Sequence, residues 1–600
     1  MDPVKTQIEI PDARYFERLI ACREACPVRT DARGYVQAVA SGDYALAYRI
    51  ARAPNPFASI CGRVCGAPCE RACRRGAIDK PVSIRAIKRT ATERHGVETP
   101  VDPIETLRHS TAPGSLNPEP LQHRVAIIGA GVAGMTCAHD LARLGVQVTV
   151  FESGPEAGGM LRTGVPVYRL PRGLWRKEIE AILHLGVELR CGTTVGRDIT
   201  IDELHAQGFE YIVIAVGLQK SRALNLPGND LDGVTGGFEF LEKFNEQQRG
   251  RALGRTVVIG GGNVAYDCAR SARRMPGTTS VTLVCLEALH EMPADEIEII
   301  EGKEENIALI NRRGPVRFVG ENGVITGLET RAVSRVFDEA GRFAPELTPG
   351  TEEVIACDHI VVAVGQQSDP GFANGVSSLE FGRSGSLLAD RNSGATSVPW
   401  LYAIGDIALG PGLFIDAIAH GQRAARGISR RLGIEEAHRD SGKRTGGLGF
   451  VEEAVRQGLR HDYLRLPRRL PPCSDENSRW SSPDAQVELT FPDKTAREQG
   501  ARCLRCEVET IFDGTKCILC GGCADVCPTW CLKLVTTEEI GLGADFPGMS
   551  AIIKDEDRCI RCGYCAERCP TDAITMESLC NFEPWTQEPE VRLLERKPQQ

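Results

Sequence analysis

Long apolar runs are missing from this sequence, and no stretch approaches the ~20 apolar residues of a membrane-spanning helix. The first segment, MDPVKTQIEIPDARYFERLI, lacks the basic and then apolar pattern of an export signal, so we expect a cytoplasmic protein. Aromatic residues are few, at 6%, and the 11 histidines are scattered. The net charge is −9 and the basic residues form no patch, so nucleic acid is not an expected partner. No acid–base or nucleophile constellation stands out, and we predict no catalytic side chain.

Cysteine, by contrast, is abundant and unevenly distributed. Of the 24 cysteines, six lie between Cys22 and Cys73 and twelve between Cys503 and Cys580. Disulfide frameworks are typical of small secreted domains, and this chain of 600 residues is neither small nor expected to be exported. In a reducing compartment, thiolates clustered at short spacing are better explained by bound metal. The other six are expected to be single buried thiols: Cys137, Cys191, Cys268, Cys285, Cys357 and Cys473.

The chain has the length of several domains. From Val125 to about residue 430, β-rich apolar runs such as RVAIIG, VQVTVFE and TVVIGGG alternate with helical patterns. This alternation predicts parallel sheets built from βαβ units. The N-terminal part predicts short helices around cysteine-rich loops, and the Arg-, Pro- and Ser-rich residues 436–500 predict an extended linker.

The segment VAIIGAGVAGMTCAHDLARLGVQVTVFE has the spacing of a dinucleotide-binding turn. Gly129, Gly131 and Gly134 directly follow a predicted strand and open a predicted helix. The first glycine allows a tight turn, the second lets the backbone approach a pyrophosphate, and the third lets helix and strand pack closely. Glu152 ends the next strand, where its carboxylate can accept hydrogen bonds from ribose hydroxyls. A glycine pattern alone often marks only a turn, but here strand, helix and acidic residue agree.

A second unit, TVVIGGGNVAYDCARSA, places Gly260, Gly262 and Ala265 in the same positions. Its acidic residue is Glu287, shortly after the following strand. Two such units predict two dinucleotides held face to face. Hydride transfer requires a redox ring beside the nicotinamide, and that ring is usually a flavin.

The C-terminal cysteines form a doubled C-x2-C-x2-C-x3-C-P run, typical of bacterial ferredoxins with two iron–sulfur clusters. In that pattern three close thiolates hold one cluster and the fourth, before Pro, reaches the other. Zinc is the alternative metal, but the doubled run is too specific for it. Cys531 and Cys580 are expected to pack without a metal role. The predicted ligand sets are Cys517, Cys520, Cys523 and Cys569 for one [4Fe–4S] cluster, and Cys527, Cys559, Cys562 and Cys565 for the other.

These motifs, together with EAGGMLRTGVPVYRLPR, two AVG segments, EMPA and LYAIGD, resemble the two-dinucleotide-binding flavoproteins. More narrowly, the sequence resembles the small subunit of bacterial glutamate synthase and the N-terminal half of dihydropyrimidine dehydrogenase. The resemblance implies FAD at the first unit and NAD(P)H at the second, with the nucleotide domain inserted into the FAD domain. It extends the expected cofactor-binding residues to Gly159, Arg162, Gly217, Asn263, Gly365, Gly405 and Asp406.

The N-terminal cysteines resemble the iron–sulfur domain that precedes FAD in this family, where two [4Fe–4S] clusters share interleaved ligands. The C-x2-C pair expected upstream of Cys22 is absent, but RCLRC, with Cys503 and Cys506, occurs near the other end of the chain. We therefore expect the C-terminal segment to fold back. One N-terminal cluster would then be held by Cys22, Cys73, Cys503 and Cys506.

The second N-terminal cluster of the family takes a Gln or Glu ligand, and the matching residue here is Lys88, which cannot be a ligand while protonated. Cys61 is an additional cysteine that can replace it. The alternative is a single N-terminal cluster with spare thiols. An iron content of about sixteen atoms per chain, rather than about twelve, would support four clusters. The predicted second set is Cys26, Cys61, Cys65 and Cys69.

Glu287, which follows a predicted strand of the second unit, affects whether NADH or NADPH is expected to bind. Relatives that use NADPH usually carry an arginine pair where this chain has CLE at 285–287. Glu287 would repel a 2′-phosphate and accept a hydrogen bond from a free 2′-hydroxyl, so NADH is favoured. Arg270, Arg273 and Arg274 lie nearby in sequence and leave NADPH possible.

We expect a multidomain α/β protein with an N-terminal helical iron–sulfur domain, two nested Rossmann-like dinucleotide-binding domains and a C-terminal bacterial-type 2[4Fe–4S] ferredoxin domain. Cys503 and Cys506, at the start of the last domain, would pack back on the first. The predicted boundaries are 1–118 for the helical domain, 119–249 and 366–435 for the FAD-binding domain, 250–365 for the NAD(P)H-binding domain, 436–500 for the linker and 501–600 for the ferredoxin-like domain.

The expected function is that of an FAD-dependent NAD(P)H:acceptor oxidoreductase. It would pass electrons between NADH, FAD and four [4Fe–4S] clusters, in either direction. Because no substrate domain is evident, we expect a catalytic partner subunit, such as a 2-oxoacid:ferredoxin oxidoreductase, or soluble ferredoxin. One alternative is a glutamate synthase small subunit that delivers NADPH electrons to an amidotransferase-type large subunit. Another is a non-enzymatic electron-relay module.

Overall fold

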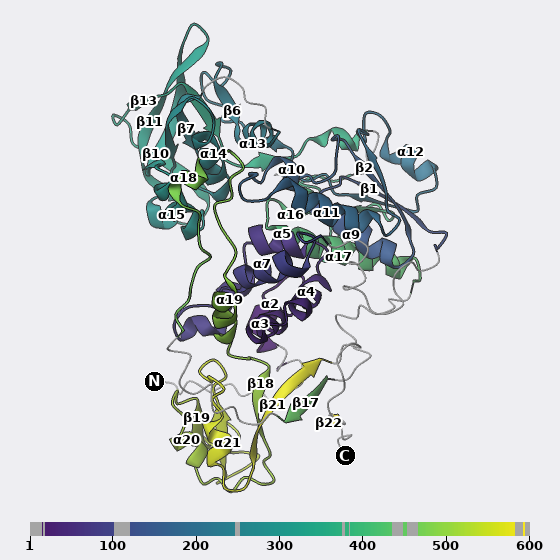
Figure 1. The fold of residues 1–600 in the computed structure, drawn as a ribbon, viewed down its shortest axis with the longest axis vertical. Helices are drawn as coiled ribbons and strands as arrows, with labels where there is room; N and C mark the ends of the chain where they lie inside the picture. Colours follow the sequence, from purple (N-terminus) through teal and green to yellow (C-terminus); the bar gives the residue numbers. More distant parts are fainter. Residues whose placement is uncertain are drawn as a thin grey trace.

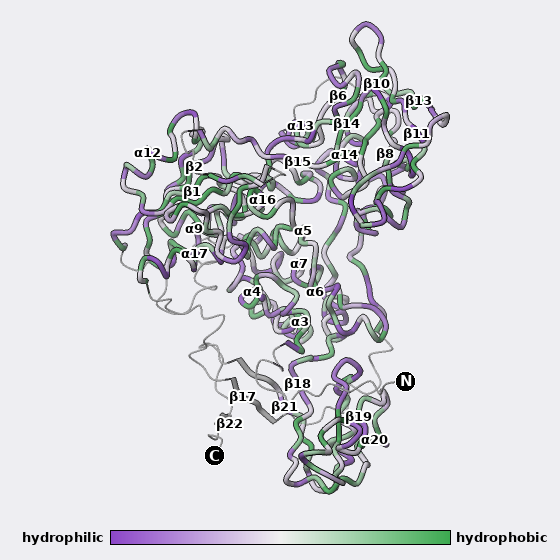
Figure 2. Tube along the Cα trace, turned by 180° about the vertical axis from the view of Figure 1, so that it is seen from behind, coloured by the Kyte–Doolittle hydropathy of each residue, from purple (hydrophilic) through white to green (hydrophobic). Residues whose placement is uncertain are grey.

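The computed structural model describes residue 15 and residues 18–100, 120–246, 253–374, 379–382, 385–434, 448–452, 466–581 and 592–593. Figure 1 shows two α/β units at the top, a helical domain at the centre and a cysteine-rich domain at the bottom. Apolar segments are concentrated in the strands and helices of the α/β units (Figure 2). Within the part of the chain that the structure describes, no helix combines the length and apolar composition needed to span a bilayer.

The N-terminal domain is built from short helices. Asp31 and Asp43 cap two of them, because their carboxylates accept hydrogen bonds from the backbone N–H groups of Gly34 (3.0 Å) and Leu46 (2.9 Å). Gly42, at φ +88°, ends the first of these two helices. The elements are α2 (Ala21–Glu24), α3 (Ala32–Ser41), α4 (Tyr44–Arg52), α5 (Ala58–Val64), α6 (Pro68–Arg71), the 3-10 turn η1 (Arg74–Ala77) and α7 (Ile84–His95).

The first α/β unit contains a five-stranded parallel sheet with the order β16-β4-β1-β2-β3. Strand β16 comes from far along the chain, so the second unit is inserted between the two parts of the first. Helices α9 and α17 pack against each other, and a Cβ at Gly421 would lie 2.4 Å from the Ala133 carbonyl oxygen. The elements are β1 (Arg124–Ile128), α9 (Val132–Arg143), β2 (Gln147–Glu152), α10 (Met160–Thr163), α11 (Arg172–Leu183), β3 (Glu188–Cys191), α12 (Ile201–Ala206), β4 (Tyr211–Ile214), β16 (Leu401–Ala403), α16 (Asp406–Leu409) and α17 (Phe414–Arg431).

The second unit is also a five-stranded parallel sheet, with the order β6-β14-β7-β8-β9. Its first strand, β6 (Val234–Gly236), pairs with β14, more than a hundred residues away. The unit therefore begins before the expected boundary at residue 250, because a short strand that forms by long-range pairing leaves little local signal. The other elements are α13 (Gly237–Asn245), β7 (Gly254–Ile259), α14 (Asn263–Arg273), β8 (Thr278–Val284), η2 (Leu289–Glu291), α15 (Glu296–Glu304), β9 (Ala308–Ile310), β10 (Arg313–Glu321), β11 (Val324–Phe337), β12 (Phe343–Leu347), β13 (Glu353–Ala356) and β14 (His359–Val362). Strands β5 (Lys220–Ser221) and β15 (Gln366–Gln367) pair with each other, and η3 (Pro370–Ala373) packs in the core of the first unit through Phe372.

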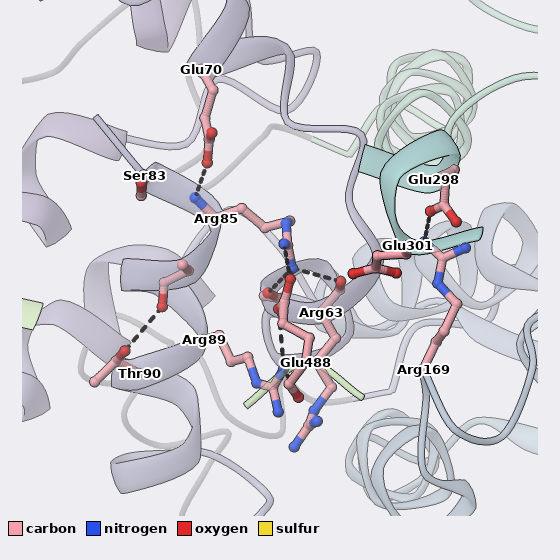
Figure 3. A network of polar contacts seen from close by, with 12 residues as sticks. Arg63, Glu70, Ser83, Arg85, Arg89, Thr90, Arg169, Glu298, Glu301 and Glu488 are labelled. Atoms are coloured by element: carbon pink, nitrogen blue, oxygen red, sulfur yellow. Dashed lines mark hydrogen bonds and ion pairs between the residues drawn. The ribbon is translucent and has the colours of Figure 1, made fainter. Parts of the chain in front are cut away.

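The chain that leads to the C-terminal domain runs back along the helical domain. Figure 3 shows Glu488 of this stretch between Arg85 and Arg89 of α7, and it forms ion pairs with both, at 3.1 Å to Arg89. In the same view Arg169 of the first α/β unit pairs with Glu298 of the second, at 2.8 Å. The pairs of Glu488 hold the returning chain on the helical domain, and the pair of Arg169 and Glu298 joins the two α/β units.

The stretch expected to be an extended linker, 436–500, contains regular structure, so that prediction is wrong for its described part. It includes β17 (Leu448–Glu452), α18 (Glu476–Arg479) and most of α19 (Asp493–Ala501). Helix α19 packs on α3, and a Cβ at Gly500 would lie 2.9 Å from a backbone oxygen of α3. Tertiary contact stabilises these elements, which composition alone did not indicate.

The C-terminal domain consists of two small antiparallel sheets and two short helices. The larger sheet has the order β18-β21-β17-β22, and the smaller one pairs β19 with β20. The elements are β18 (Val508–Phe512), α20 (Gly522–Asp525), β19 (Leu532–Thr536), β20 (Ser550–Lys554), α21 (Tyr564–Arg568), β21 (Ile574–Asn581) and β22 (Arg592–Leu593).

Candidate dinucleotide and iron–sulfur sites

The first glycine-rich turn has the geometry that its three glycines predict. Gly129 adopts φ +104°, and a Cβ there would lie 2.6 Å from the Ala215 carbonyl oxygen. A Cβ at Gly134 would lie 2.1 Å from the carbonyl oxygen of Gly129, so helix α9 can approach β1 only with glycine at this position. At Gly131 a Cβ would meet nothing within 4 Å. The middle glycine therefore leaves an open cradle at the N-terminus of α9, where a pyrophosphate fits.

Glu152, at the end of β2, lies beneath this turn. One carboxylate oxygen accepts a hydrogen bond from the Ala130 backbone N–H at 2.9 Å, and the other accepts one from that of Gly154 at 2.7 Å. Gly159 is close to the same place, since a Cβ there would lie 3.0 Å from the Gly131 Cα. The structure thus brings the predicted acidic residue and three predicted glycines to one edge of the sheet.

Further expected cofactor-binding residues lie at the ends of other strands. Gly217 and Gly365 have φ values of +67° and +120°, and a Cβ at either would meet nothing within 4 Å. At Gly405, the backbone N–H donates to Nδ1 of the buried His420 at 3.1 Å, which orients the turn before α16. Burial, followed by the charge of Asp416, raises the pKa of Asp406 to about 6.

Arg162 differs from the other expected cofactor contacts. Its guanidinium is paired with Glu246 at 2.5 Å and with Glu242 at 3.6 Å, both on α13 or just after it. The side chain therefore links the first α/β unit to the second. The sequence offered no signal for this ion pair, because the partners are about eighty residues apart.

The second glycine-rich turn repeats the geometry of the first. Gly260 adopts φ +147°, and a Cβ there would lie 2.4 Å from the Ala363 carbonyl oxygen. A Cβ at Gly262 would meet only Pro293, at 3.9 Å, and Ala265 is fully buried behind the turn. The side chain of Asn263 donates to a carboxylate oxygen of Asp295 at 3.0 Å and accepts from its backbone N–H at 2.8 Å. This reciprocal pair anchors the start of α14.

Glu287 reaches over the second turn, since a Cβ at Gly261 would lie 2.6 Å from its carboxylate oxygen. Its backbone carbonyl accepts hydrogen bonds from the Asn311 side chain at 3.0 Å and from the Arg312 backbone N–H at 3.2 Å. The Arg312 guanidinium pairs with Glu291 at 2.9 Å. Sequence reasoning missed Asn311 and Arg312, which are brought to this site by the connection between β9 and β10.

The arginines considered as supports for NADPH are engaged elsewhere. Arg270 and Arg274 both pair with the buried Glu305, at 2.9 Å and 2.7 Å. Arg273 lies over the ring of Trp480, 5.0 Å from its centroid. These contacts stabilise the packing of α14 against α15 and α18.

Four cysteines from distant parts of the chain line one cavity, and we call them the outer N-terminal set: Cys22, Cys73, Cys503 and Cys506. Burial, and then the neighbouring thiols of Cys503 and Cys506, raises the pKa of Cys22 well above its ordinary value. Thiols that raise one another's pKa in this way are stabilised as thiolates only by a cation or a metal.

The fold-back that completes the outer N-terminal set is anchored by Arg502. This side chain is fully buried, and it donates to the backbone oxygens of Leu466 (2.8 Å), Pro81 (2.9 Å) and Lys80 (2.7 Å). It also pairs with Asp79 at 2.8 Å. A buried guanidinium that is fully hydrogen-bonded fixes the segment before Cys503 against the helical domain.

The remaining N-terminal cysteines all interact electrostatically with the buried side chain of Lys88, and we call them the inner N-terminal set: Cys26, Cys61, Cys65 and Cys69. The hydrogen bond with Cys61, followed by the charge of Lys88, lowers the pKa of Cys65 to about 6. Cys26 and Cys61 belong to the same apolar core as the first α/β unit. The inner N-terminal set therefore lies on the side of the helical domain that faces this unit.

One predicted group of the C-terminal domain lines a second cavity, and we call it the inner ferredoxin set: Cys527, Cys559, Cys562 and Cys565. Cys531 also lines this cavity, with its Sγ 3.3 Å from that of Cys527. A hydrogen bond from Cys531 lowers the pKa of Cys559 to about 5. Cys531 is packed, as expected, but it contacts two of the predicted ligands.

The other predicted group, the outer ferredoxin set, consists of Cys517, Cys520, Cys523 and Cys569. Burial, followed by the thiols of Cys517 and Cys520, raises the pKa of Cys523. Cys569 packs in the same apolar cluster as Cys523. Cys520 is exposed, so this set lies at the surface of the chain.

The two cysteine-rich regions meet at Arg561. Its guanidinium is fully buried and pairs at 2.7 Å with Glu509, three residues after Cys506. It also donates to the backbone oxygen of Cys559 at 3.1 Å. The inner ferredoxin set therefore lies close to the outer N-terminal set.

The donor chemistry fits iron–sulfur clusters. Nowhere in the described ranges do three His, Cys, Asp or Glu side chains close around a point that could hold a single metal ion. Four thiols spread around a cavity suit a cluster in which each iron binds one thiolate. Of the single cysteines, Cys191 and Cys473 are exposed, so the expectation of burial is wrong for these two; Cys191 ends the edge strand β3.

Comparison with known proteins tests the assignment of the fold. Residues 123–421 match the model of the pyridine nucleotide-disulphide oxidoreductases. Residues 18–99 match that of the dihydropyrimidine dehydrogenase domain II with a 4Fe–4S cluster, and residues 552–575 match a 4Fe–4S binding domain. The NADP(+)-dependent formate dehydrogenase subunit beta of Moorella thermoacetica is 36% identical over 506 residues, which cover 81% of this chain and 70% of that protein. The chain belongs to this family of pyridine nucleotide-dependent oxidoreductases.

Two other members of the family extend the comparison. The NADPH-Fe(3+) oxidoreductase subunit beta of Geobacter sulfurreducens is 32% identical over 82% of this chain and 76% of that protein. The glutamate synthase [NADPH] small chain of Azospirillum brasilense is 29% identical over 68% of this chain and 85% of that protein. The expected resemblance and fold class are confirmed, and the chain is an oxidoreductase that uses FAD, NAD(P) and 4Fe–4S clusters.

Proposed function

We propose that this family member passes electrons between NADH, FAD and four [4Fe–4S] clusters, to or from a partner subunit. The proposal rests on the spatial order of the four cysteine sets, which begins in the core of the first α/β unit and ends at the surface of the C-terminal domain. In order, these are the inner N-terminal, outer N-terminal, inner ferredoxin and outer ferredoxin sets. Each would hold one cluster.

The first α/β unit would hold FAD. The open positions at Gly131, Gly217 and Gly365 leave room for the cofactor, and the N-terminus of α9 would bind its pyrophosphate. Glu152 would accept from the ribose, and Gly405 and Asp406 would face the ribityl–phosphate part. When bound, FAD takes up a hydride as an electron pair and releases the electrons singly.

The second unit would bind NADH, with Glu287 as the residue that selects it. A carboxylate above the turn accepts from a 2′-hydroxyl and repels a 2′-phosphate. The relatives compared above carry NADP(H) in their names, so the preference is testable against them. In Glu287→Arg we expect the ratio of kcat/KM for NADH over NADPH to fall by roughly tenfold or more. Glu321→Gln, an exposed glutamate at the end of β10 of the same unit, is the matched control. An unchanged ratio in Glu287→Arg would refute the role of Glu287.

The partner would be a catalytic subunit of a larger complex or a soluble ferredoxin in the cytoplasm. The names of three relatives describe subunits or chains, of a formate dehydrogenase, an NADPH-Fe(3+) oxidoreductase and a glutamate synthase. Cys520 is exposed, which supports an outer ferredoxin set that a second protein could reach. A reducing compartment would keep the thiols available for clusters.

Anaerobic purification tests the whole proposal. We expect bound FAD, about sixteen iron atoms per chain, and bleaching of the flavin absorbance on addition of NADH. About twelve iron atoms would reduce the number of clusters to three. A chain with bound FAD that neither NADH nor NADPH bleaches would instead be an electron-relay module.

A further inference from the structure

Lys88 is a buried lysine on the helical domain, close to predicted cluster ligands. It lies on α7 and its side chain is buried. Helix α7 packs closely beside Cys61, since a Cβ at Gly62 would lie 2.9 Å from the Cα of Arg89, and the ammonium interacts electrostatically with the four thiols of the inner N-terminal set. Its Nζ is 5.4 Å from the ring centroid of Tyr35. Among the residues that the structure describes, no carboxylate forms an ion pair with this ammonium and no oxygen accepts a hydrogen bond from it.

An ammonium group buried without an anion is strongly unfavourable, and proteins avoid it by pairing. Two other charged residues near these cysteines are paired with opposite charges, and the exposed Arg71 donates to the backbone oxygen of Gly66. Arg85 pairs with Glu488, and Glu70 pairs with Arg468 at 2.5 Å. Lys88 therefore adds one positive charge, without a carboxylate partner among the described residues, beside these four cysteines.

A [4Fe–4S] cluster bound by four thiolates has a net negative charge, which would supply the missing anion. We propose that Lys88 is the charge partner of the cluster held by Cys26, Cys61, Cys65 and Cys69, and that its ammonium raises the reduction potential of that cluster. This inference rests on the ligand set of the proposed function. Reduction adds one electron to the cluster and breaks no bond, so the negative charge next to Lys88 increases by one. The ammonium therefore stabilises the reduced form more than the oxidised form.

The consequence for function is a cluster that is easier to reduce at the point where electrons leave the flavin domain. The inner N-terminal set shares its apolar core with the first α/β unit, and a Cβ at Gly66, next to Cys65, would lie 2.8 Å from Leu413 of the flavin domain. The low-dielectric surroundings strengthen the effect of one charge. Lys88 would therefore act on the reduction potential of the cluster through its charge, and it would not be a ligand.

A redox titration followed by electron paramagnetic resonance tests the proposal in the full chain with its cofactors. In Lys88→Met we expect the midpoint potential of one of the four clusters to become more negative, and NADH to reduce a smaller fraction of it at equilibrium. Lys88→Arg keeps the charge and should keep a midpoint close to that of the wild type. Arg49→Gln, an exposed charge on α4 of the same domain, should shift none of the clusters. The affected signal is assigned as the one that Cys26→Ser removes.

Unchanged midpoints for all clusters in Lys88→Met would overturn the inference. If Lys88→Met does not assemble the cluster, seen as a loss of about four iron atoms per chain, the neutral Lys88→Gln is titrated instead. An unchanged midpoint in Lys88→Gln would also overturn it. If the wild-type chain and Cys26→Ser give the same cluster signals, the proposed ligand set is refuted. A signal that is present but insensitive to Lys88 would refute only the role of the charge.

Discussion

The junction between the two iron–sulfur regions yields a prediction of stability. Arg561 and Glu509 expose 1% and 0% of their side chains and pair at 2.7 Å. Lys554 lies 3.5 Å from Glu509, and Glu556 is paired with both cations, at 2.7 Å to Lys554 and 3.6 Å to Arg561. Two cations and two carboxylates thus form one buried network without net charge. The perturbation that we consider is Arg561→Met, which removes one cation and keeps the apolar volume.

The expected loss follows from the charge that remains. Breaking a buried ion pair by removing one partner typically costs about 3–5 kcal/mol, because the other charge stays buried. Lys554 still compensates part of the charge of Glu509, so we expect the low end, about 3 kcal/mol. Removing both partners in Arg561→Met/Glu509→Gln should recover most of this loss, because no unpaired charge is left by the change.

The assay is denaturant-induced unfolding of the C-terminal domain in the full chain, followed through the loss of cluster absorbance. Arg568→Met removes an exposed arginine of the same domain and should change the free energy of unfolding by no more than about 0.5 kcal/mol. A free energy of unfolding for Arg561→Met equal to that of Arg568→Met would refute the reasoning. A double variant that is less stable than Arg561→Met would refute the assignment of the loss to unpaired charge.

Two further perturbations test the fold-back and the contact between domains. Cys503→Ser should lower the iron content by about four atoms per chain and remove one cluster signal, while Cys473→Ser, at an exposed single cysteine, should leave both unchanged. Glu178, on α11, accepts from the backbone N–H groups of Ser59 (2.8 Å) and Ile60 (3.3 Å) at the start of α5, and burial raises its pKa from 4.5 to about 7. The folded state then binds this proton more tightly than the unfolded state, so the contribution of Glu178 to stability should fall by about 3 kcal/mol between pH 4.5 and 7 and level off above. In Glu178→Gln, denaturant unfolding measured across this range should lack that part of the slope; an identical pH profile would refute it.

The features that sequence predicted well depend on contacts that are local in the chain. Gly129 and Gly260 need a positive φ within a strand–turn–helix unit of about thirty residues, and such a unit leaves a complete pattern in the sequence. The ferredoxin run is equally local, because cluster ligands at a spacing of three residues come from one loop. The fold-back was predictable for another reason. The C-x2-C pair that the family pattern has before Cys22 was missing there, and a matching pair, Cys503 and Cys506, was present near the other end of the chain.

The features that sequence did not predict depend on pairing between distant segments. Strand β6 joins its sheet through β14, so the boundary at residue 250 was placed too late. Arg162 has the position of a cofactor contact in the family pattern, and its pairing with Glu246 became visible only in the structure. Cys531 looked like an unremarkable packed thiol, because its contact with Cys527 depends on how the loop closes. In each case the local sequence was compatible with more than one environment.

The fold-back of residues 503–506 onto the helical domain also fixes how the C-terminal domain is oriented relative to the helical domain. Strand β18 begins at Val508, two residues after Cys506, so the segment that completes the outer N-terminal set also starts the C-terminal sheet. With Arg502 buried at one end and the pair of Glu509 and Arg561 at the other, this segment has little freedom to move. The inner ferredoxin set is thereby held next to the helical domain. A ferredoxin domain joined by a free linker would have no fixed inner side. We propose that Cys503 and Cys506, as ligands of one site, would also orient the next, because this C-x2-C pair lies beside the ferredoxin domain and not at the N-terminus.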